Sequence, residues 1–357
     1  MQALTGAPTR RGADEEGYRT MSTEQNIHQV FGAELSPYSV KVRSYCRYKG
    51  IPHEWIVRSS RNEEDFRRHA KLPLVPLVVC PDGQVLQDST PIIEALEARY
   101  PEPSIHPDEP VARFVSELLE EFGDEWGNKW MFHYRWAREA DQLSAAARLA
   151  AAMMPDVDAP TRETIAASIR ERMVGRVWFV GSSPETAARI EQSFADGLAL
   201  LEAHLATQPY LFGGRPAFAD FGLWGQIYNA WTDPTPREII EGAAPHTLAW
   251  IRRMLEPSAL GAFESWATLE PTLLPLLEQQ VGRLFLPWSA ANARALAAAE
   301  QEFTTPLGGQ SWTQKPQKYH ARSLAALKIK FKQVRSDATL QRVLQSSDCL
   351  RWLHDDA

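Results

Sequence analysis

A proline-rich stretch near residue 105 separates two parts of the sequence whose hydrophobic patterns differ. Before it, short apolar runs alternate with helix-like segments, whereas after it the spacing of apolar residues is almost entirely helical. The chain has 357 residues, too many for one ordinary core, because domains usually span ~100–200 residues. The sequence therefore predicts a small α/β domain over residues 26–104, a linker at 105–110 and an all-helical domain over 111–299.

The two ends of the chain differ from both domains. Residues 1–25 are polar and charged, so we expect a disordered tail, and the sequence does not decide between Met1 and Met21 as the start. The paired arginines in this tail are not followed by an apolar run, which argues against an export signal. Residues 300–357 contain a glycine-rich turn and a basic stretch, and we expect them to form an extension with one or two helices on the outside.

Bulk composition excludes several classes of function. The net charge of -7 disfavours binding of the whole chain to nucleic acid or anionic membranes, which needs clustered positive charge. No run approaches the ~18–20 apolar residues of a membrane span. The three cysteines are far apart without a CxxC motif, and no His, Cys, Asp or Glu cluster has metal-ligand spacing. We therefore expect a reduced, cytoplasmic protein that binds no metal.

The pattern of residues 26–104 predicts strands and helices in the order β-α-β-α-β-β-α. The first helix should end at Gly50, and Asp82-Gly83 between β-forming runs indicates a hairpin. A last helix should open at Asp88-Ser89, because such residues satisfy free N–H groups in a first turn. This order is typical of a small α/β sandwich with a mixed sheet.

Several runs of this sequence resemble cytosolic glutathione S-transferases of the serine type. The resemblance covers residues 28–100 well and 186–255 moderately. It implies a thioredoxin-like N-terminal domain followed by an all-α C-terminal domain. Its motifs are Ser36-Pro37-Tyr38-Ser39, Leu74-Val75-Pro76-Leu77-Val78, Leu86-Gln87-Asp88-Ser89 and the run from Pro209 to Phe221.

In the last of these motifs Ala217 stands where the family has Ser or Thr three residues before Asp220. Alanine has no side-chain acceptor, so we expect half of a capping box to be missing there, a loss of ~1 kcal/mol.

The resemblance implies that Ser36 is the catalytic residue and also contacts glutathione. An unperturbed thiol has a pKa of ~8.5 and is a poor nucleophile at neutral pH. A helix N-terminus and a serine hydroxyl both favour the thiolate, and a hydrogen bond to a charged group is worth ~1.5–3 kcal/mol, or ~1–2 pKa units. Because no cysteine stands at this position, thiol–disulfide exchange is disfavoured.

The resemblance assigns the rest of the glutathione site to two more motifs. Pro76 would be cis, so that the main chain of Val75 faces the ligand; the alternative is a proline that merely begins an edge strand. Asp88 and Ser89 would hold the γ-glutamyl end, and they could also serve as a simple helix cap. Lys71 could reach the glycyl carboxylate, although a lone lysine is more often only solvated.

The resemblance places the electrophile pocket at Tyr38 and at the first helix of the second domain. Trp126, Trp130 and His133 follow one face of that helix. The alternative is packing in the core or at a subunit interface, since aromatic stripes are usually core.

We therefore expect a homodimeric transferase that uses glutathione as co-substrate and conjugates it to a small apolar electrophile. One alternative is a non-catalytic binding or scaffold protein of the same fold, which the long segment 138–185 and the C-terminal extension make credible. Another is a glutathione-dependent lyase, isomerase or peroxidase that uses the same serine. Glutathione binding separates the scaffold from both kinds of enzyme.

Overall fold

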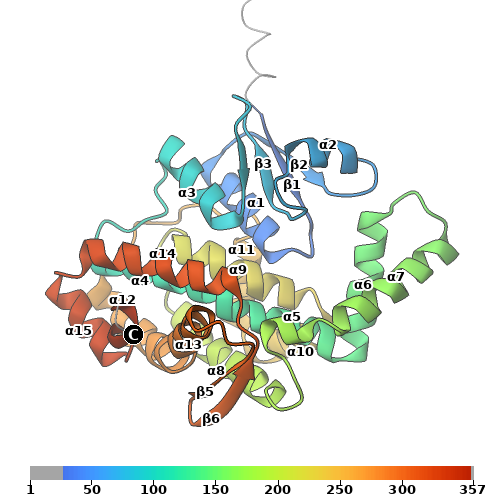
Figure 1. The fold of residues 1–357 in the computed structure, drawn as a ribbon. Coiled ribbons are helices and arrows are strands. Elements are labelled where there is room, and N and C mark those ends of the chain that lie inside the picture. Colours follow the sequence, from blue (N-terminus) through green and yellow to red (C-terminus); the bar gives the residue numbers. More distant parts are fainter. Residues whose placement is uncertain (1–26, 355–357) are drawn as a thin grey trace, which may run out of the picture.

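A computed structural model describes residues 27–354, so the expected tail lies outside the described part of the chain. A small sheet domain stands on a larger body of helices (Figure 1). Within residues 27–354, no helix is long and apolar enough to span a membrane.

The first domain is a four-stranded mixed sheet with three helices, as predicted. The strand order is β2-β1-β3-β4, with β1 parallel to β2 and antiparallel to β3. β3 is antiparallel to β4. The elements are β1 (His28–Gly32), α1 (Pro37–Lys49), β2 (His53–Val57), α2 (Glu63–His69), β3 (Leu77–Val79), β4 (Val85–Gln87) and α3 (Ser89–Arg99).

The turn residues of this domain act where the sequence indicated. Gly50 ends α1 with a φ of 63°, a left-handed conformation that glycine adopts without strain. Gly83 has a φ of 80° in the hairpin between β3 and β4, where the N–H of Cys80 donates to the carbonyl of Gln84 at 2.8 Å.

The linker is packed rather than free. Ile105 is fully buried, and its carbonyl accepts a hydrogen bond from the N–H of Phe218 at 3.0 Å. This contact fixes the chain between the two domains against the start of α9 (Phe218–Trp231).

The second domain is helical. Between residues 111 and 299 the structure contains two isolated β-bridges, both at Gly213, and no strand ladder. Its elements, besides α9, are α4 (Pro110–Phe122), η2 (Gly123–Gly127), α5 (Asn128–Ala137), α6 (Glu139–Met153), α7 (Ala159–Val174), η3 (Val177–Val180), α8 (Ala187–Leu205), α10 (Pro234–Ala243), α11 (Pro245–Arg253), α12 (Trp266–Leu276), η4 (Leu277–Phe285) and α13 (Leu286–Ala297).

The segment 138–185 forms a helical hairpin, α6 and α7, that rises beside the first domain (Figure 1). Its helices share a small core with α5, which includes Trp136 of α5 and Ile169 of α7. The tip of the hairpin reaches the first domain, because the carbonyl of Met153 accepts the N–H of Ser60 at 2.8 Å.

The C-terminal segment contains more helices and strands than expected, and several of its side chains are buried in the main core. It contains the hairpin β5 (Phe303–Leu307) and β6 (Gln310–Gln314), followed by α14 (Lys318–Val334), α15 (Ala338–Ser346) and α16 (Leu350–Leu353).

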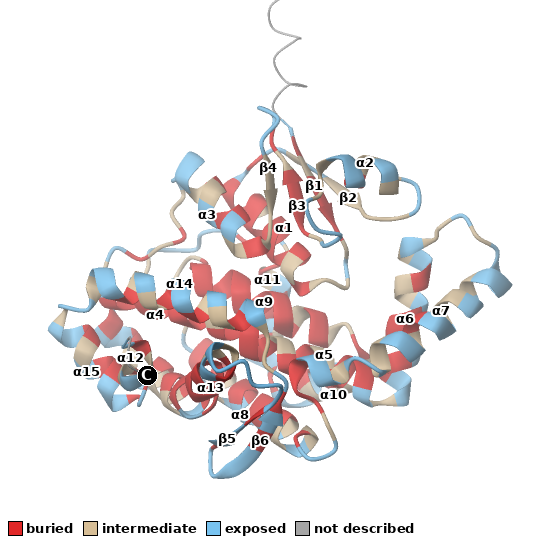
Figure 2. Ribbon diagram, in the orientation of Figure 1, coloured by how far each residue is buried: buried red, intermediate tan, exposed pale blue. Residues whose placement is uncertain are grey.

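The expectation of one or two outer helices missed the strand hairpin and a third helix, whereas α14 is an outer helix with one buried face. Leu324, Leu327 and Phe331 recur at helical spacing and are buried in the main core, which explains why this helix lies on α4 (Figure 2).

Candidate functional site

Three segments of the first domain meet at one edge of the sheet. Leu77, the first residue of β3, pairs with Phe31 near the end of β1 and with Gln87 at the end of β4. Strand β1 runs on into the loop before α1, β3 begins just after Pro76, and β4 ends just before Asp88. The sheet therefore gathers the predicted glutathione residues at this edge.

Ser36 caps the N-terminus of α1, as predicted. Its Oγ accepts a hydrogen bond from the N–H of Ser39 at 3.2 Å, and its backbone is extended with a φ of -105°. A hydroxyl that accepts in this way still has its own proton to donate. The side chain is partly exposed, so the hydroxyl combines a structural bond with a free donor at a helix end.

The Val75-Pro76 peptide bond is cis, as the resemblance implied. Among residues 27–354, the main-chain N–H and C=O of Val75 have no hydrogen-bond partner. Gln87 holds the preceding loop, because its Nε2 donates to the carbonyls of Leu72 and Leu74 at 2.7 and 2.8 Å. The loop is thus tethered while the main chain of Val75 keeps its bonding capacity.

Asp88 and Ser89 begin α3 without forming a side-chain cap. Asp88 has a φ of 81°, which is strained for a residue other than glycine, and such strain concentrates at binding sites. Ser89 is 1% exposed, and its Oγ has no partner among the described residues. A buried hydroxyl without a partner is uncommon and fits a ligand group that completes it.

Burial raises the pKa of the Asp88 carboxyl, while the positive charge of Lys41 and the hydroxyl of Tyr319 lower it. Lys71 lies exposed in the connection between α2 and β3. Its predicted contact with a glycyl carboxylate stays a prediction.

A buried ion cluster joins this edge to the helical domain. The Nζ of Lys41 on α1 lies 2.5 Å from Glu120 and 2.6 Å from Asp124, at the end of α4 and the start of η2. It also donates to Thr90 in the first turn of α3 at 3.1 Å. Burial opposes the positive charge of Lys41, but the two carboxylates raise its pKa overall. One lysine therefore connects α1, α3 and the helical domain.

Tyr38 lies in the same interface and not in an apolar pocket. Its hydroxyl donates to the carbonyl of Asp124 at 3.0 Å. Burial and the charges of Asp124 and Glu125 raise its pKa well above the usual range. Tyr38 therefore stays protonated and links the start of α1 to η2, a π-helical turn of a kind often found at functional sites.

The aromatic face of η2 and α5 belongs to the core. Trp126 and Trp130 are 0% and 1% exposed, and both indole N–H groups donate to Ser193 at 2.9 and 3.0 Å. His133 is 1% exposed and bonds to Ser182 and Glu191. These three side chains have no free surface for an electrophile. Core packing, the alternative interpretation, describes them instead.

The C-terminal extension reaches this edge of the sheet, which the sequence did not indicate. The hydroxyl of Tyr319, in the first turn of α14, lies 3.3 Å from each carboxylate oxygen of Asp88. The next residue, His320, bonds to the buried carboxylate of Glu125 on η2. Two consecutive residues of α14 thus contact both sides of the domain interface.

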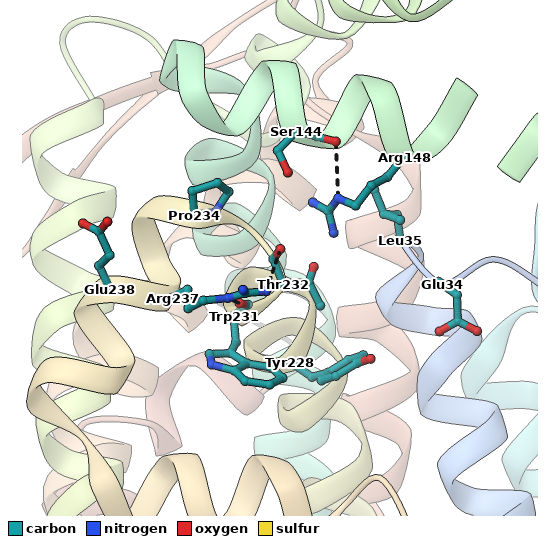
Figure 3. Close-up of a pocket in the computed structure, with 10 residues that line it drawn as sticks. All are labelled: Glu34, Leu35, Ser144, Arg148, Tyr228, Trp231, Thr232, Pro234, Arg237 and Glu238. Atoms are coloured by element: carbon teal, nitrogen blue, oxygen red, sulfur yellow. Dashed lines mark hydrogen bonds between the residues drawn. The ribbon is translucent and has the colours of Figure 1, made fainter. Parts of the chain in front are cut away.

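A pocket of about 680 Å³ lies beside the loop between β1 and α1, between the first domain and helices α6, α9 and α10 (Figure 3). Glu34 and Leu35 form the wall that leads to Ser36, and Tyr228 and Trp231 form an aromatic wall. Ser36 itself does not line it. The lining residues are Glu34, Leu35, Ser144, Arg148, Tyr228, Trp231, Thr232, Pro234, Arg237 and Glu238.

The start of α9 shows the half-complete cap expected from the sequence. The Asp220 carboxylate accepts the N–H groups of Ala217 and Leu211 at 2.9 Å each and the indole N–H of Trp250 at 2.8 Å. Burial raises the pKa of Asp220 to about 7, against these three donors. The carboxylate acts as an anchor for the helical core.

Sequence reasoning missed Lys41, Gln87 and Tyr319. The first could have been found, because Lys41 lies four residues from both Pro37 and Tyr45, on the buried face of α1. A lysine at such a position needs an acidic partner. Tyr319 carries no comparable local signal.

Comparisons with known proteins cover both domains. Residues 35–99 match the family model of the glutathione S-transferase N-terminal domain, and residues 184–253 match that of the C-terminal domain. A maleylacetoacetate isomerase from Pseudomonas aeruginosa is 25% identical over 226 residues, which are 59% of this chain and 88% of that protein.

Two solved structures illustrate the wider likeness. A glutathione S-transferase from Methylobacterium radiotolerans in complex with glutathione sulfonate is 18% identical, with a TM-score of 0.41 over 67% of this chain and 99% of the other. A beta-etherase from Sphingobium sp. strain SYK-6 is 19% identical, with a TM-score of 0.45 over 64% and 94% of the two chains. The two family models match in order along one chain, so residues 35–99 and 184–253 are similar to the N- and C-terminal domains of the glutathione S-transferase family.

Proposed function

We propose that the protein is a glutathione-dependent enzyme that binds glutathione at the sheet edge formed by Ser36, Val75 and Ser89. The proposal rests on hydrogen-bonding groups at this edge of the sheet that are still able to bond a ligand. The Val75 main chain and the buried Ser89 hydroxyl have no partners among the described residues, and Ser36 keeps a proton to donate. Three segments that are far apart in sequence share this property.

Each residue has a role set by its chemistry. Val75 pairs with the ligand main chain as a neighbouring strand would. Ser89 and the N-terminus of α3 bind the γ-glutamyl carboxylate, and Asp88 binds the α-ammonium group. Lys71 is proposed for the glycyl carboxylate. The Ser36 hydroxyl donates a hydrogen bond to the glutathione sulfur and thereby favours the thiolate, which is the nucleophile.

The second substrate is proposed to be a small electrophile with an apolar surface. The pocket beside the β1–α1 loop supports this, because Tyr228 and Trp231 form one of its walls next to the loop that ends at Ser36. Trp231→Ala should raise the KM for such an electrophile and leave the Kd for glutathione unchanged. A rise in both the KM and the glutathione Kd would contradict the assignment of this pocket to the electrophile.

A glutathione-dependent isomerase is the second candidate. It is favoured by the match to maleylacetoacetate isomerase, which covers 88% of that protein. Both candidates need the same thiolate at Ser36, so a panel of electrophiles tested beside cis–trans isomerisation substrates distinguishes them. The proposal also includes a homodimer, which light scattering during gel filtration tests.

The first experiment is calorimetric titration of the full chain with glutathione, followed by ultraviolet titration of the bound thiolate against pH. Ser36→Ala should raise the thiol pKa, while Ser39→Ala, one turn further along, serves as the matched control and should change it little. If the wild type does not bind glutathione, the enzyme proposal fails and the scaffold alternative takes its place. If Ser36→Ala leaves the titration unchanged, Ser36 is only a helix cap.

A further inference from the structure

The first turn of α14 brings a side chain from the C-terminal extension onto the proposed glutathione site. The Tyr319 hydroxyl lies 3.3 Å from both carboxylate oxygens of Asp88, 231 residues away in sequence. Tyr319 is 40% exposed as a residue, so part of it is open to solvent. This contact joins the extension to a residue that the proposed function assigns to the γ-glutamyl end.

The position of Tyr319 is fixed by contacts on either side of it. Before it, the main chain of Gln317 forms two hydrogen bonds with the side chain of Asn292, at 2.7 and 2.9 Å. After it, His320 bonds to Glu125 and packs edge-on against Trp288. The tyrosine therefore projects from a helix start that is held by the core.

We infer that Tyr319 is a positioning residue of the glutathione site, whose hydroxyl orients the Asp88 carboxylate toward the α-ammonium group of a γ-glutamyl ligand. The inference rests on the proposed function. A carboxylate has about four lone-pair sites, so it can accept from the tyrosine and from an ammonium group at once. Asp88 is half-buried on a strained backbone without a side-chain cap, and the hydroxyl adds a bond from the helical domain to the one that the N–H of Ser89 gives.

Other groups also face Asp88 and set its titration. Lys41 and Tyr38 face it from α1, Glu125 from η2 and Tyr319 from α14. Lys41 and the Tyr319 hydroxyl favour the carboxylate, whereas burial and Glu125 oppose it. Removing the hydroxyl should therefore raise the pH at which glutathione binding is lost on the acid side.

The test measures Kd by calorimetry for Tyr319→Phe with two ligands, glutathione and its analogue without the α-amino group. The variant keeps the ring and should bind glutathione about 3- to 10-fold more weakly, as expected for one hydrogen bond to a charged group at long distance. The analogue lacks the group that Asp88 holds, so its affinity should be nearly unchanged. Tyr100→Phe, at the other end of α3, is the matched control and should change neither Kd.

The outcomes are distinguishable. If wild-type protein binds glutathione and Tyr319→Phe binds it equally or more tightly, the positioning role is wrong and the contact is incidental or blocking. Equal losses for both ligands would indicate a general structural role and would also overturn it. If neither the wild type nor Tyr319→Phe binds the analogue, the pH dependence of the glutathione Kd distinguishes the two roles. Only a positioning role raises the pH at which Tyr319→Phe loses glutathione binding on the acid side. Absence of glutathione binding by the wild type would instead remove the proposed function.

Discussion

The starts of α1 and α3 meet the helical domain at the same interface, but they are completed differently. At α1, Ser36 caps the helix through Ser39 and still has a proton to donate. At α3, neither Asp88 nor Ser89 caps the helix, and the buried Ser89 hydroxyl has no partner among the described residues. The start of α1 therefore has its side-chain cap without a ligand, whereas the start of α3 has a buried hydroxyl that a ligand could still bond.

This difference suggests a division of roles. A capped helix start holds its hydroxyl rigidly, which suits stabilisation of charge on a sulfur atom. An uncapped start with free polar groups suits binding, because a ligand supplies the missing partners. Changes at α1 should therefore alter turnover, and changes at α3 should alter affinity.

The largest effect is expected from Lys41→Met, which removes the residue that connects both helix starts. It leaves Glu120 and Asp124 buried without their cation, and breaking such a pair costs about 3–5 kcal/mol of unfolding free energy. Urea denaturation followed by tryptophan fluorescence measures the loss. Arg61→Met, which breaks an exposed ion pair with Asp156, is the control and should change little. An unchanged midpoint for Lys41→Met would show that the two starts are not joined through this lysine.

Ser36→Ala tests the role of the α1 start. Loss of a hydrogen bond to a thiolate, ~1.5–3 kcal/mol, predicts a fall of ~10- to 150-fold in kcat with little change in the glutathione Kd. Stopped-flow and steady-state kinetics with the best electrophile from the panel measure it. A loss of affinity as large as the loss of turnover would contradict the division of roles.

The pH dependence should separate the two starts. Burial raises the pKa of Asp88, and in the proposed function its charged form holds the ammonium group, so affinity should be full above that pKa and fall as the pH drops through it. Asp88→Asn should flatten this acid limb and weaken binding roughly tenfold at neutral pH. We expect turnover to rise on the alkaline side as the glutathione thiol ionises, and this rise should move only in Ser36→Ala. If Asp88→Asn moves the alkaline side, the two starts act together.

The smallest effect is expected from Ser89→Ala. Removal of a buried hydroxyl that has no partner among residues 27–354 should leave stability nearly unchanged, while loss of one hydrogen bond to glutathione should weaken binding about 2- to 10-fold. Calorimetry gives the affinity, and thermal unfolding without ligand gives the stability. A clear fall in melting temperature would mean that Ser89 has a structural partner in solution and that α3 is capped after all.

Local sequence patterns predicted the first domain well. Gly50, the Asp82-Gly83 turn and the serine before α1 each determine their own surroundings, so their structures followed from short motifs. For the aromatic stripe at Trp126 and Trp130 the sequence left an electrophile pocket and core packing as alternatives, because periodicity identifies a buried face but not what covers it.

The contact of Tyr319 with Asp88 depends on the packing of α14 against α4, across the whole chain. No local rule predicts such a pairing. No local rule predicts the partners of Lys41 either, although the sequence pattern places Lys41 itself on the buried face of α1.

The packing of α14 also determines how the chain can fold as it is made. Phe331 lies against Phe114 of α4, with ring centroids 5.5 Å apart, so the second domain lacks part of its interior until α14 has left the ribosome. The first domain is complete much earlier and can fold while synthesis continues. A nascent chain that stops before Lys318 would therefore carry a folded sheet domain beside helices that expose apolar surface, which is the kind of product that chaperones and proteases recognise.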